Sequence, residues 1–350
     1  MKLTINKKAF DITKASLPKL DAYATQPWQR EIVQFLQLWY DSPEYIEQKT
    51  SGSTGTPKRI KLLKKTMLHS AGMTNAFLGL NEQSVSLLCL PASYIAGKMM
   101  LVRAIAGNYN IIAVEPSANP FEDKKYPPLD FTAITPYQLV HSAKAISQTK
   151  INNIIVGGSQ VTTEMEKLVS TWPMRIFETF GMTETASHIA LRRLNGVERS
   201  NYFHTLEGVE LSLDKRGCLV VDAPHLTGEQ LVTNDLVELK DASTFRWLGR
   251  IDKVINTGGV KIFAEQVERK LQPLIKKPFF IAGLPDKTLG QQVVLVIESS
   301  DLPDEQLALL HASMKAALDR FEVPGRIICV PGFVYSNGDK LLRDETIKHF

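Results

Sequence analysis

Between residues 28 and 180 the chain contains short apolar runs and stretches whose apolar residues recur at helical spacing. The apolar runs predict strands over residues 59–62, 85–90, 110–114, 131–135, 151–156 and 175–180. The periodic stretches predict helices over residues 28–40, 64–78, 94–106 and 136–146. This alternation constrains the fold to the α/β class, with layered sheets and helices.

The pattern of predicted elements changes from Glu207 onward, where short predicted strands are separated by turn sequences such as Asp214-Lys215-Arg216-Gly217. A β-rich subdomain is therefore expected there. Beyond residue 253, predicted helices at 264–274 and 303–318 and predicted strands at 279–284 and 291–298 indicate a small α+β domain.

A chain of 350 residues exceeds the usual size of a single core. We therefore expect a large N-terminal domain over residues 1–249 and a small C-terminal domain over residues 250–350, with the boundary between Gly249 and Lys253.

The segment Thr50-Ser51-Gly52-Ser53-Thr54-Gly55-Thr56-Pro57-Lys58 combines hydroxyls, two glycines and a lysine. Glycines let successive backbone N–H groups converge on an anion, and the hydroxyls and Lys58 add donors and charge. The segment lacks G-x-x-x-x-G-K-[ST] and is therefore not a Walker A loop. A triphosphate-binding loop is predicted, with a plain surface turn as the alternative.

Further motifs follow in a fixed order. They are Phe177-Glu178-Thr179-Phe180-Gly181-Met182-Thr183-Glu184-Thr185, Val232-Thr233-Asn234-Asp235-Leu236, Gly249-Arg250-Ile251-Asp252-Lys253, Asn256-Thr257-Gly258-Gly259-Val260-Lys261-Ile262 and Asn337-Gly338-Asp339-Lys340-Leu341-Leu342-Arg343. Together with the hydroxyl-rich loop, this series resembles the adenylate-forming superfamily of acyl-CoA synthetases, adenylation domains and luciferases. The resemblance runs from about residue 50 to residue 343, and it implies ATP, Mg²⁺ and CoA as cofactor and co-substrates.

The resemblance also implies roles for individual residues. The β- and γ-phosphates of ATP would lie against Thr50, Ser51, Gly52, Ser53, Thr54, Gly55 and Lys58. Glu184 would bind Mg²⁺, and Thr183 beside it would contact the α-phosphate. Adenine would lie in a site that includes Gly181, between Phe180 and the wall formed by Gly157 and Gly158. Asp235, helped by Arg250, would bind the ribose hydroxyls.

Two further roles concern the C-terminal domain. Lys340 would bridge the substrate carboxylate and the α-phosphate, because an ammonium offsets the charge that builds between two anions. The domain would then turn about a hinge at Asp252, which brings Gly258 and Gly259 to the site where the CoA thiol reacts.

The run from Gly181 to Arg193 looks most like the o-succinylbenzoate–CoA ligases of menaquinone biosynthesis. Their substrate is a dianion, so its distal carboxylate needs a cation. Lys98, Arg103, His188 and Arg192 are candidates by chemistry, although Arg103 is expected to be a surface or ion-paired residue. Tyr94, Lys98 and His188 are expected in the acyl pocket, and Tyr94 stands where these ligases usually have histidine.

The chain departs from the family in two other places. Asp339 separates Gly338 from Lys340, and only 49 residues precede the hydroxyl-rich loop, where related ligases have many more. Either the chain is a compact variant or its activity has been lost. The alternatives to o-succinylbenzoate activation are ligation of another aryl or fatty acid, loading of a carrier protein, and nucleotide binding without ligation.

The net charge of +4 suits small anionic substrates better than nucleic acid, and no nucleic-acid-reading motif is present. Cys89, Cys218 and Cys329 lack metal-binding spacing and indicate reduced thiols in a cytoplasmic protein. No segment predicts a signal peptide or a membrane span. A homo-oligomer is possible on this sequence.

Overall fold

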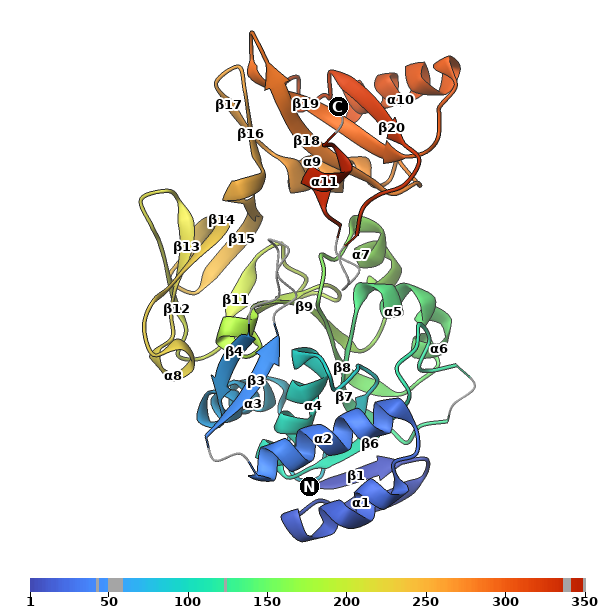
Figure 1. Ribbon diagram of the computed structural model, residues 1–350, viewed down its shortest axis with the longest axis vertical. Coiled ribbons are helices and arrows are strands. Elements are labelled where there is room, and N and C mark those ends of the chain that lie inside the picture. The colour runs from blue at the N-terminus through green and yellow to red at the C-terminus, as the bar shows by residue number, and fades with distance from the viewer. Residues whose placement is uncertain (42–43, 50–58, 123–124, 336–340, 349–350) are drawn as a thin grey trace.

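The computed structural model describes residues 1–41, 44–49, 59–122, 125–335 and 341–348. Within these ranges, residues 2–250 contribute thirteen strands to one continuous sheet, in the order β12-β13-β14-β15-β11-β10-β9-β8-β7-β5-β6-β1-β2. Figure 1 shows this sheet below a smaller sheet that residues 254–330 form. The α/β class expected from the sequence is confirmed.

Six neighbouring strands of the large sheet are parallel. They are β1 (Lys2–Ile5), β5 (Val85–Leu88), β6 (Asn110–Ala113), β7 (Leu129–Ile134), β8 (Ile151–Val156) and β9 (Arg175–Gly181), and β2 (Lys8–Asp11) pairs with β1 at the edge. Their sequences are nearly continuous apolar runs because both faces of this region are buried.

Helices cover both faces of the parallel region. The helices are α1 (Leu17–Tyr23), α2 (Pro27–Asp41), α3 (Lys64–Leu78), α4 (Ile95–Gly107), α5 (Pro136–His141), α6 (Ala143–Ser147) and α7 (Thr163–Val169). Alternate residues of β7 point to different cores: Phe131 packs with residues of α2–α4, and Ile134 packs with residues of α5–α7.

The second half of the large sheet is antiparallel. It consists of β10 (His188–Arg193), β11 (Phe203–Thr205), β12 (Glu210–Leu213), β13 (Cys218–Asp222), β14 (Leu231–Asp241) and β15 (Thr244–Arg250), with α8 (Pro224–Thr227) between β13 and β14. The β-rich subdomain predicted beyond Glu207 thus continues the same sheet. Separately, β3 (Tyr45–Lys49) and β4 (Arg59–Leu63) form a two-stranded sheet.

Residues beyond 253 build a sheet and cores of their own. The strands are β16 (Val254–Thr257), β17 (Val260–Phe263), β18 (Phe279–Asp286), β19 (Gly290–Glu298) and β20 (Arg326–Val330), and the helices are α9 (Ala264–Leu271), α10 (Asp304–Ala317) and α11 (Arg343–Thr346). Their two apolar clusters share no residue with the clusters of residues 3–247. The domain division at residues 249 and 250 stays a prediction.

Several boundaries differ from those predicted. The single helix expected over residues 136–146 is two helices, because Ser142 leaves the helical conformation (φ −99°, ψ 3°) and its hydroxyl donates to the Ala118 carbonyl. Residues 45–49, for which the sequence analysis predicts no strand, form strand β3. Across the part of the chain that is described, no helix is long and apolar enough to span a membrane.

Candidate active site

Several of the predicted site residues lie at one edge of the parallel region. Gly157 and Gly158 follow β8, Gly181 ends β9, and Glu184 lies in the short helix η2 (Thr183–Thr185) just beyond. The segment after β5 leads to Tyr94 at the start of α4. Because the carboxyl ends of parallel strands share an edge, these segments meet where α/β sheets bind ligands.

Two of the predicted site segments lie outside the described residues: 50–58, with the phosphate-binding residues, and 336–340, with Lys340. Their neighbours are placed. Lys49 pairs with Arg59 across β3 and β4, and β4 packs against η2. Tyr335 forms an isolated bridge with Leu341. The chain therefore enters and leaves residues 50–58 beside the turn that carries Glu184.

The η2 turn presents Glu184 to solvent. Among the described residues, its carboxylate makes no ion pair, whereas the neighbouring Thr185 is buried and donates its hydroxyl to the Ser187 carbonyl at 2.7 Å. Ala186 follows with φ 61°, a conformation that a residue with a side chain rarely adopts. An exposed lone carboxylate suits Mg²⁺, which commonly binds through one or two carboxylates and the phosphates of its substrate.

The predicted adenine platform is Phe180. Its half-buried ring packs edge-on against Phe245, with ring centroids 5.0 Å apart, and against Phe203 at 5.9 Å. Gly181 next to it has a packing reason for being glycine, because a Cβ there would lie 2.3 Å from the Cα of His188 on β10. The ring is thus fixed from one side at the edge where Gly158 also lies.

The predicted ribose ligand Asp235 is half-buried on β14. Trp247 Nε1 donates to its Oδ1 at 2.9 Å, and Arg250 is its partner across β14 and β15. Burial raises the pKa of Asp235, although the Trp247 hydrogen bond and Arg250 oppose that rise. The contact between Trp247 and this carboxylate was not predicted from the motifs.

Arg103, the cation that the sequence argument favoured least, has surroundings that are unusual for a charged side chain. Arg103 on α4 is 2% exposed, and its guanidinium contacts Ser187 Oγ at 2.5 Å, His188 Nδ1 at 3.5 Å and Met100 Sδ at 3.9 Å. Among the described residues it has no carboxylate partner, and its Nε has no acceptor. The expectation that Arg103 is a surface or ion-paired residue is therefore wrong.

His188 is buried beside this arginine. Burial and the Arg103 charge together hold the pKa of His188 well below its ordinary value, so the imidazole is neutral at pH 7. Thr74 Oγ1 donates to the Ser70 carbonyl and lies 3.2 Å from His188 Nε2. These partners assign the proton to Nε2 and leave Nδ1 as an acceptor that faces Arg103.

Arg192 was also considered as a cation for the substrate, and the structure shows it fully engaged elsewhere. It donates to Glu178 Oε2 at 2.5 and 2.8 Å and to Glu166 Oε1 at 2.8 Å, and all three side chains are buried. The sequence argument missed Glu178 and Glu166. Glu178 lies in the motif Phe177–Thr185, two residues before Phe180. A glutamate inside a strand that is predicted to be buried indicates a buried cationic partner, and this was the signal in the sequence that could have identified Glu178.

The remaining pocket candidates differ in exposure. The Lys98 ammonium lies 2.6 Å from Gln48 Oε1, and burial lowers its pKa, although Glu31 opposes that change. Tyr94 is 58% exposed at the start of the same helix. Lys98 is thus held near the β3–β4 hairpin, while Tyr94 faces solvent.

The predicted hinge residue and the predicted thiol-site residues lie at different ends of the smaller part, residues 250–350. Asp252 lies in the short helix η3 (Ile251–Lys253), which joins β15 to β16. Asp252 accepts a hydrogen bond from Arg250 Nε at 3.0 Å. Gly258 (φ 56°) and Gly259 (φ 83°) form the two-residue turn between β16 and β17, which requires positive φ at both positions. Figure 1 shows this hairpin at the end of the molecule away from β9.

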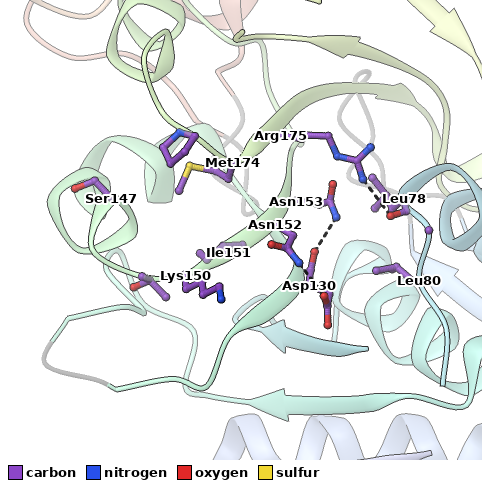
Figure 2. A pocket seen from close by; sticks show the side chains of 13 residues that line it. Leu78, Leu80, Asp130, Ser147, Lys150, Ile151, Asn152, Asn153, Met174 and Arg175 are labelled. Atoms are coloured by element: carbon purple, nitrogen blue, oxygen red, sulfur yellow. Dashed lines mark hydrogen bonds between the residues drawn. The ribbon is translucent and has the colours of Figure 1, made fainter. Parts of the chain in front are cut away.

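Two hollows open on the described surface. One, of about 550 Å³, lies at the amino ends of β7–β9 around Asp130, Asn153 and Arg175 (Figure 2). It is at the opposite edge of the sheet from the predicted site residues and contains none of them. The other, of about 710 Å³, is a groove between α5 and α7 on one side and residues 272–279, 333, 335 and 341 on the other. It borders the segment that contains Lys340.

The chain matches known proteins over most of its length. The model of the family described as AMP-binding enzyme matches residues 45–229. The 2-succinylbenzoate–CoA ligase of Bacillus mycoides (strain KBAB4) is 23% identical, over 85% of this chain and 69% of that protein. The probable 2-succinylbenzoate–CoA ligase of Mycobacterium tuberculosis (strain CDC 1551 / Oshkosh) is 26% identical, over 79% of this chain and 76% of that protein.

Solved structures of adenylate-forming enzymes are also similar to this chain. An acyl-CoA synthetase (AMP-forming)/AMP-acid ligase II-like protein from Dyadobacter fermentans DSM 18053 is 33% identical, with a TM-score of 0.63 over 96% of this chain and 98% of that chain. The Bacillus subtilis o-succinylbenzoate CoA synthetase, solved with ATP and magnesium, shares the fold at 18% identity, with a TM-score of 0.69 over 99% and 83% of the two chains. The chain therefore belongs to the AMP-binding family of adenylate-forming enzymes.

Proposed function

We propose that this protein is an ATP-dependent acid–CoA ligase whose substrate is o-succinylbenzoate. In the first step a substrate carboxylate oxygen attacks the α-phosphorus of ATP, which forms the acyl-adenylate and releases pyrophosphate. In the second step the CoA thiolate attacks the acyl carbon, which forms the thioester and releases AMP. The 2-succinylbenzoate–CoA ligases among the relatives support this assignment.

The observation that carries the choice of acid is Arg103. A buried charge without a counter-charge is costly, and protein interiors normally compensate it. Burial lowers the pKa of Arg103 to about 10, so its guanidinium is still charged at neutral pH. The missing counter-ion is an anion that the substrate can supply.

The place of Arg103 fits the second carboxylate of a dianionic acid. Its partners Ser187 and His188 follow within four residues of Glu184. A ligand reaching from the reacting phosphate toward α4 would thus find the guanidinium beyond the η2 turn. A fatty acid would bring only apolar groups to this cation, whereas o-succinylbenzoate brings a carboxylate.

The other residues keep the roles that the sequence predicts, as part of this proposal. Glu184 would hold Mg²⁺, which neutralises charge on the ATP phosphates, and Thr183 would contact the α-phosphate. Phe180 would bind adenine, and Asp235, oriented by Trp247, would accept hydrogen bonds from the ribose. Lys340 would stabilise the charge between the two reacting anions.

Pyrophosphate release from ATP and Mg²⁺ tests the proposal, measured with o-succinylbenzoate, with benzoate and with a medium-chain fatty acid, each with and without CoA. We expect turnover with o-succinylbenzoate alone, accelerated by CoA, and a thioester product detected by mass. Turnover restricted to another acid would overturn the substrate. Binding of ATP without pyrophosphate release from any acid would overturn the ligase function.

A matched pair of lysine variants accompanies this assay. Lys340→Ala is expected to abolish pyrophosphate release, whereas Lys348→Ala removes a lysine that pairs with exposed Glu345 at 2.8 Å and should leave the rate unchanged. Equal rates in the two variants would contradict the role of Lys340.

A further inference from the structure

Glu166 on α7 is a buried carboxylate that binds three arginines. Its Oε1 accepts from Arg192 at 2.8 Å and from Arg269 at 2.6 Å, and its Oε2 accepts from Arg199 at 2.9 Å. Burial disfavours the charged form of Glu166, but the three guanidinium groups outweigh this and lower its pKa. The carboxylate is therefore firmly ionised in the folded protein.

One of these three partners comes from a different part of the molecule. Arg192 and Arg199 belong to the chain before residue 250, whereas Arg269 lies on α9 of the smaller part. Among the ion pairs of the described residues, Glu166–Arg269 is the one that joins residues 1–249 to residues 250–350. Its arginine is 37% exposed and its carboxylate 2%, so the contact lies at the margin of the interface.

The network continues from Glu166 to the predicted nucleotide site. Arg192 links Glu166 to Glu178, and Glu178 Oε1 accepts a hydrogen bond from the Val161 backbone N–H at 2.9 Å. Val161 ends the loop that begins at Gly157 and includes Gly158. Glu178 is also two residues before Phe180. A chain of hydrogen bonds thus runs from Arg269 on α9 to Glu178 and to the loop that follows Gly158.

This contact belongs to the arrangement that we assign to adenylation. Tyr335 and Leu341, which flank the segment that contains Lys340, line the groove against α7. The Gly258–Gly259 turn, the predicted element of the thioester step, lies at the far end of the smaller part (Figure 1). Glu166–Arg269 therefore helps to hold the smaller part with Tyr335 and Leu341 toward α7 and with the Gly258–Gly259 turn away from it.

We infer that Arg269 is a positioning residue for the adenylation step, acting through Glu166 to hold the C-terminal part in this arrangement. The inference rests on the proposed two-step function. The network is suited to a contact that breaks in each cycle, because Glu166 keeps Arg192 and Arg199 when Arg269 leaves. No unpaired buried charge would result, and the half-exposed Arg269 would return to water.

Arg199 provides a matched control. Like Arg269 it donates to Glu166 from a partly exposed position, but both ends of that ion pair lie before residue 250. Arg269→Gln and Arg199→Gln remove the same charge from the same carboxylate. A purely structural role predicts similar effects of the two variants, whereas a positioning role predicts an effect of Arg269→Gln on one step of the reaction.

The experiment measures the two steps separately under single-turnover conditions. Arg269→Gln should slow pyrophosphate release about tenfold, the size expected when one partly exposed charged hydrogen bond no longer favours the competent arrangement. It should leave thioester formation from added acyl-adenylate and CoA unchanged, and Arg269→Lys should restore most of the loss. Arg199→Gln should leave both steps near the wild-type rate. Equal slowing of both steps, or the same pattern in Arg199→Gln, would overturn the inference.

A second measurement does not depend on the acid. Spin labels at Lys144→Cys and Lys315→Cys, both exposed and on opposite sides of the interface, report the distance between the two parts in a Cys329→Ser background. Arg269→Gln should broaden the distance distribution, and Arg199→Gln should not. Identical distributions would overturn the positioning role. Absence of pyrophosphate release from the wild type would instead refute the proposed function.

Discussion

Two buried arginines in this protein have opposite surroundings. Arg192 on β10 is 3% exposed and donates to two buried carboxylates, and Arg103 on α4 is 2% exposed and has none among the described residues. Burial disfavours the charge of both. Glu178 and Glu166 outweigh that effect and raise the pKa of Arg192, whereas the pKa of Arg103 falls to about 10.

The difference separates a cation that builds the fold from one available to a ligand. Arg192 joins β9, β10 and α7, so its charge is used entirely by the protein. The Arg103 guanidinium contacts a hydroxyl, a neutral imidazole and a thioether. None of these groups carries a negative charge, so a net positive charge is left in the interior. A site that must recognise an anion requires such an imbalance before the anion arrives.

The largest expected effect is on stability when Arg192 is removed. Arg192→Met leaves Glu178 without its cation and Glu166 with only two partly exposed arginines, so we expect a loss of about 3–5 kcal/mol in the free energy of unfolding. Urea unfolding measures this. Arg216→Met, which removes a solvent-exposed pair with Asp214, should cost far less. Similar losses in the two variants would remove the distinction.

The next effect concerns pH and tests the positive charge beside His188. The folded-state pKa of His188 lies well below the unfolded value of about 6.5, so the unfolded chain takes up the proton first. Stability is therefore full above pH 6.5 and falls by about 1.4 kcal/mol for each pH unit below it, until the folded pKa is reached. The described groups that face this imidazole are Arg103, Ser187 and Thr74, none of which is acidic.

His188→Gln keeps an N–H donor for Thr74 and removes the titration. Denaturant unfolding between pH 5 and pH 7.5 should show a shallower loss of stability with falling pH in this variant than in the wild type. Parallel curves would mean that His188 is not held neutral by Arg103 and burial.

The smallest expected effect is on stability when Arg103 is removed. Arg103→Met replaces an uncompensated buried charge with an apolar side chain of similar length, so the free energy of unfolding should change by less than about 1 kcal/mol, or rise. Comparison with Arg192→Met by the same urea assay gives the contrast directly. A loss as large as that of Arg192→Met would show that Arg103 is a structural residue.

Sequence periodicity predicted the fold well where local pattern decides it. The strand Ile151–Val156 and the helix Lys64–Leu78 occur with the predicted bounds, because apolar runs and helical spacing are local signals. The merger of the β-rich region into the parallel sheet was not predictable, since it depends on β10 pairing with β9. That pairing is a tertiary contact that Gly181 permits by lacking a Cβ.

Candidate site residues could be named from sequence, but the charge partners around them could not. Phe180 lies on the predicted strand and Thr183 and Glu184 lie just beyond it, as expected, whereas Asp235 lies on β14, at a position where no strand was predicted. Arg103 and Arg192 looked alike as isolated arginines. Only packing shows that Glu166, 26 residues before Arg192, neutralises one of them and that no carboxylate of the described chain reaches the other.

The most direct test of this account compares two acids in wild type and Arg103→Met. o-Succinylbenzoate has two carboxylates, and 4-oxo-4-phenylbutanoate has the same ring, ketone and chain but lacks the ring carboxylate. The ratio of their kcat/KM values for adenylation measures what the second carboxylate contributes. A charged hydrogen bond contributes about 1.5–3 kcal/mol, so the wild type should prefer the dianion roughly 10- to 150-fold. Arg103→Met should bring that ratio close to one. A preference that survives in Arg103→Met, and disappears instead in Lys98→Met, would contradict the account.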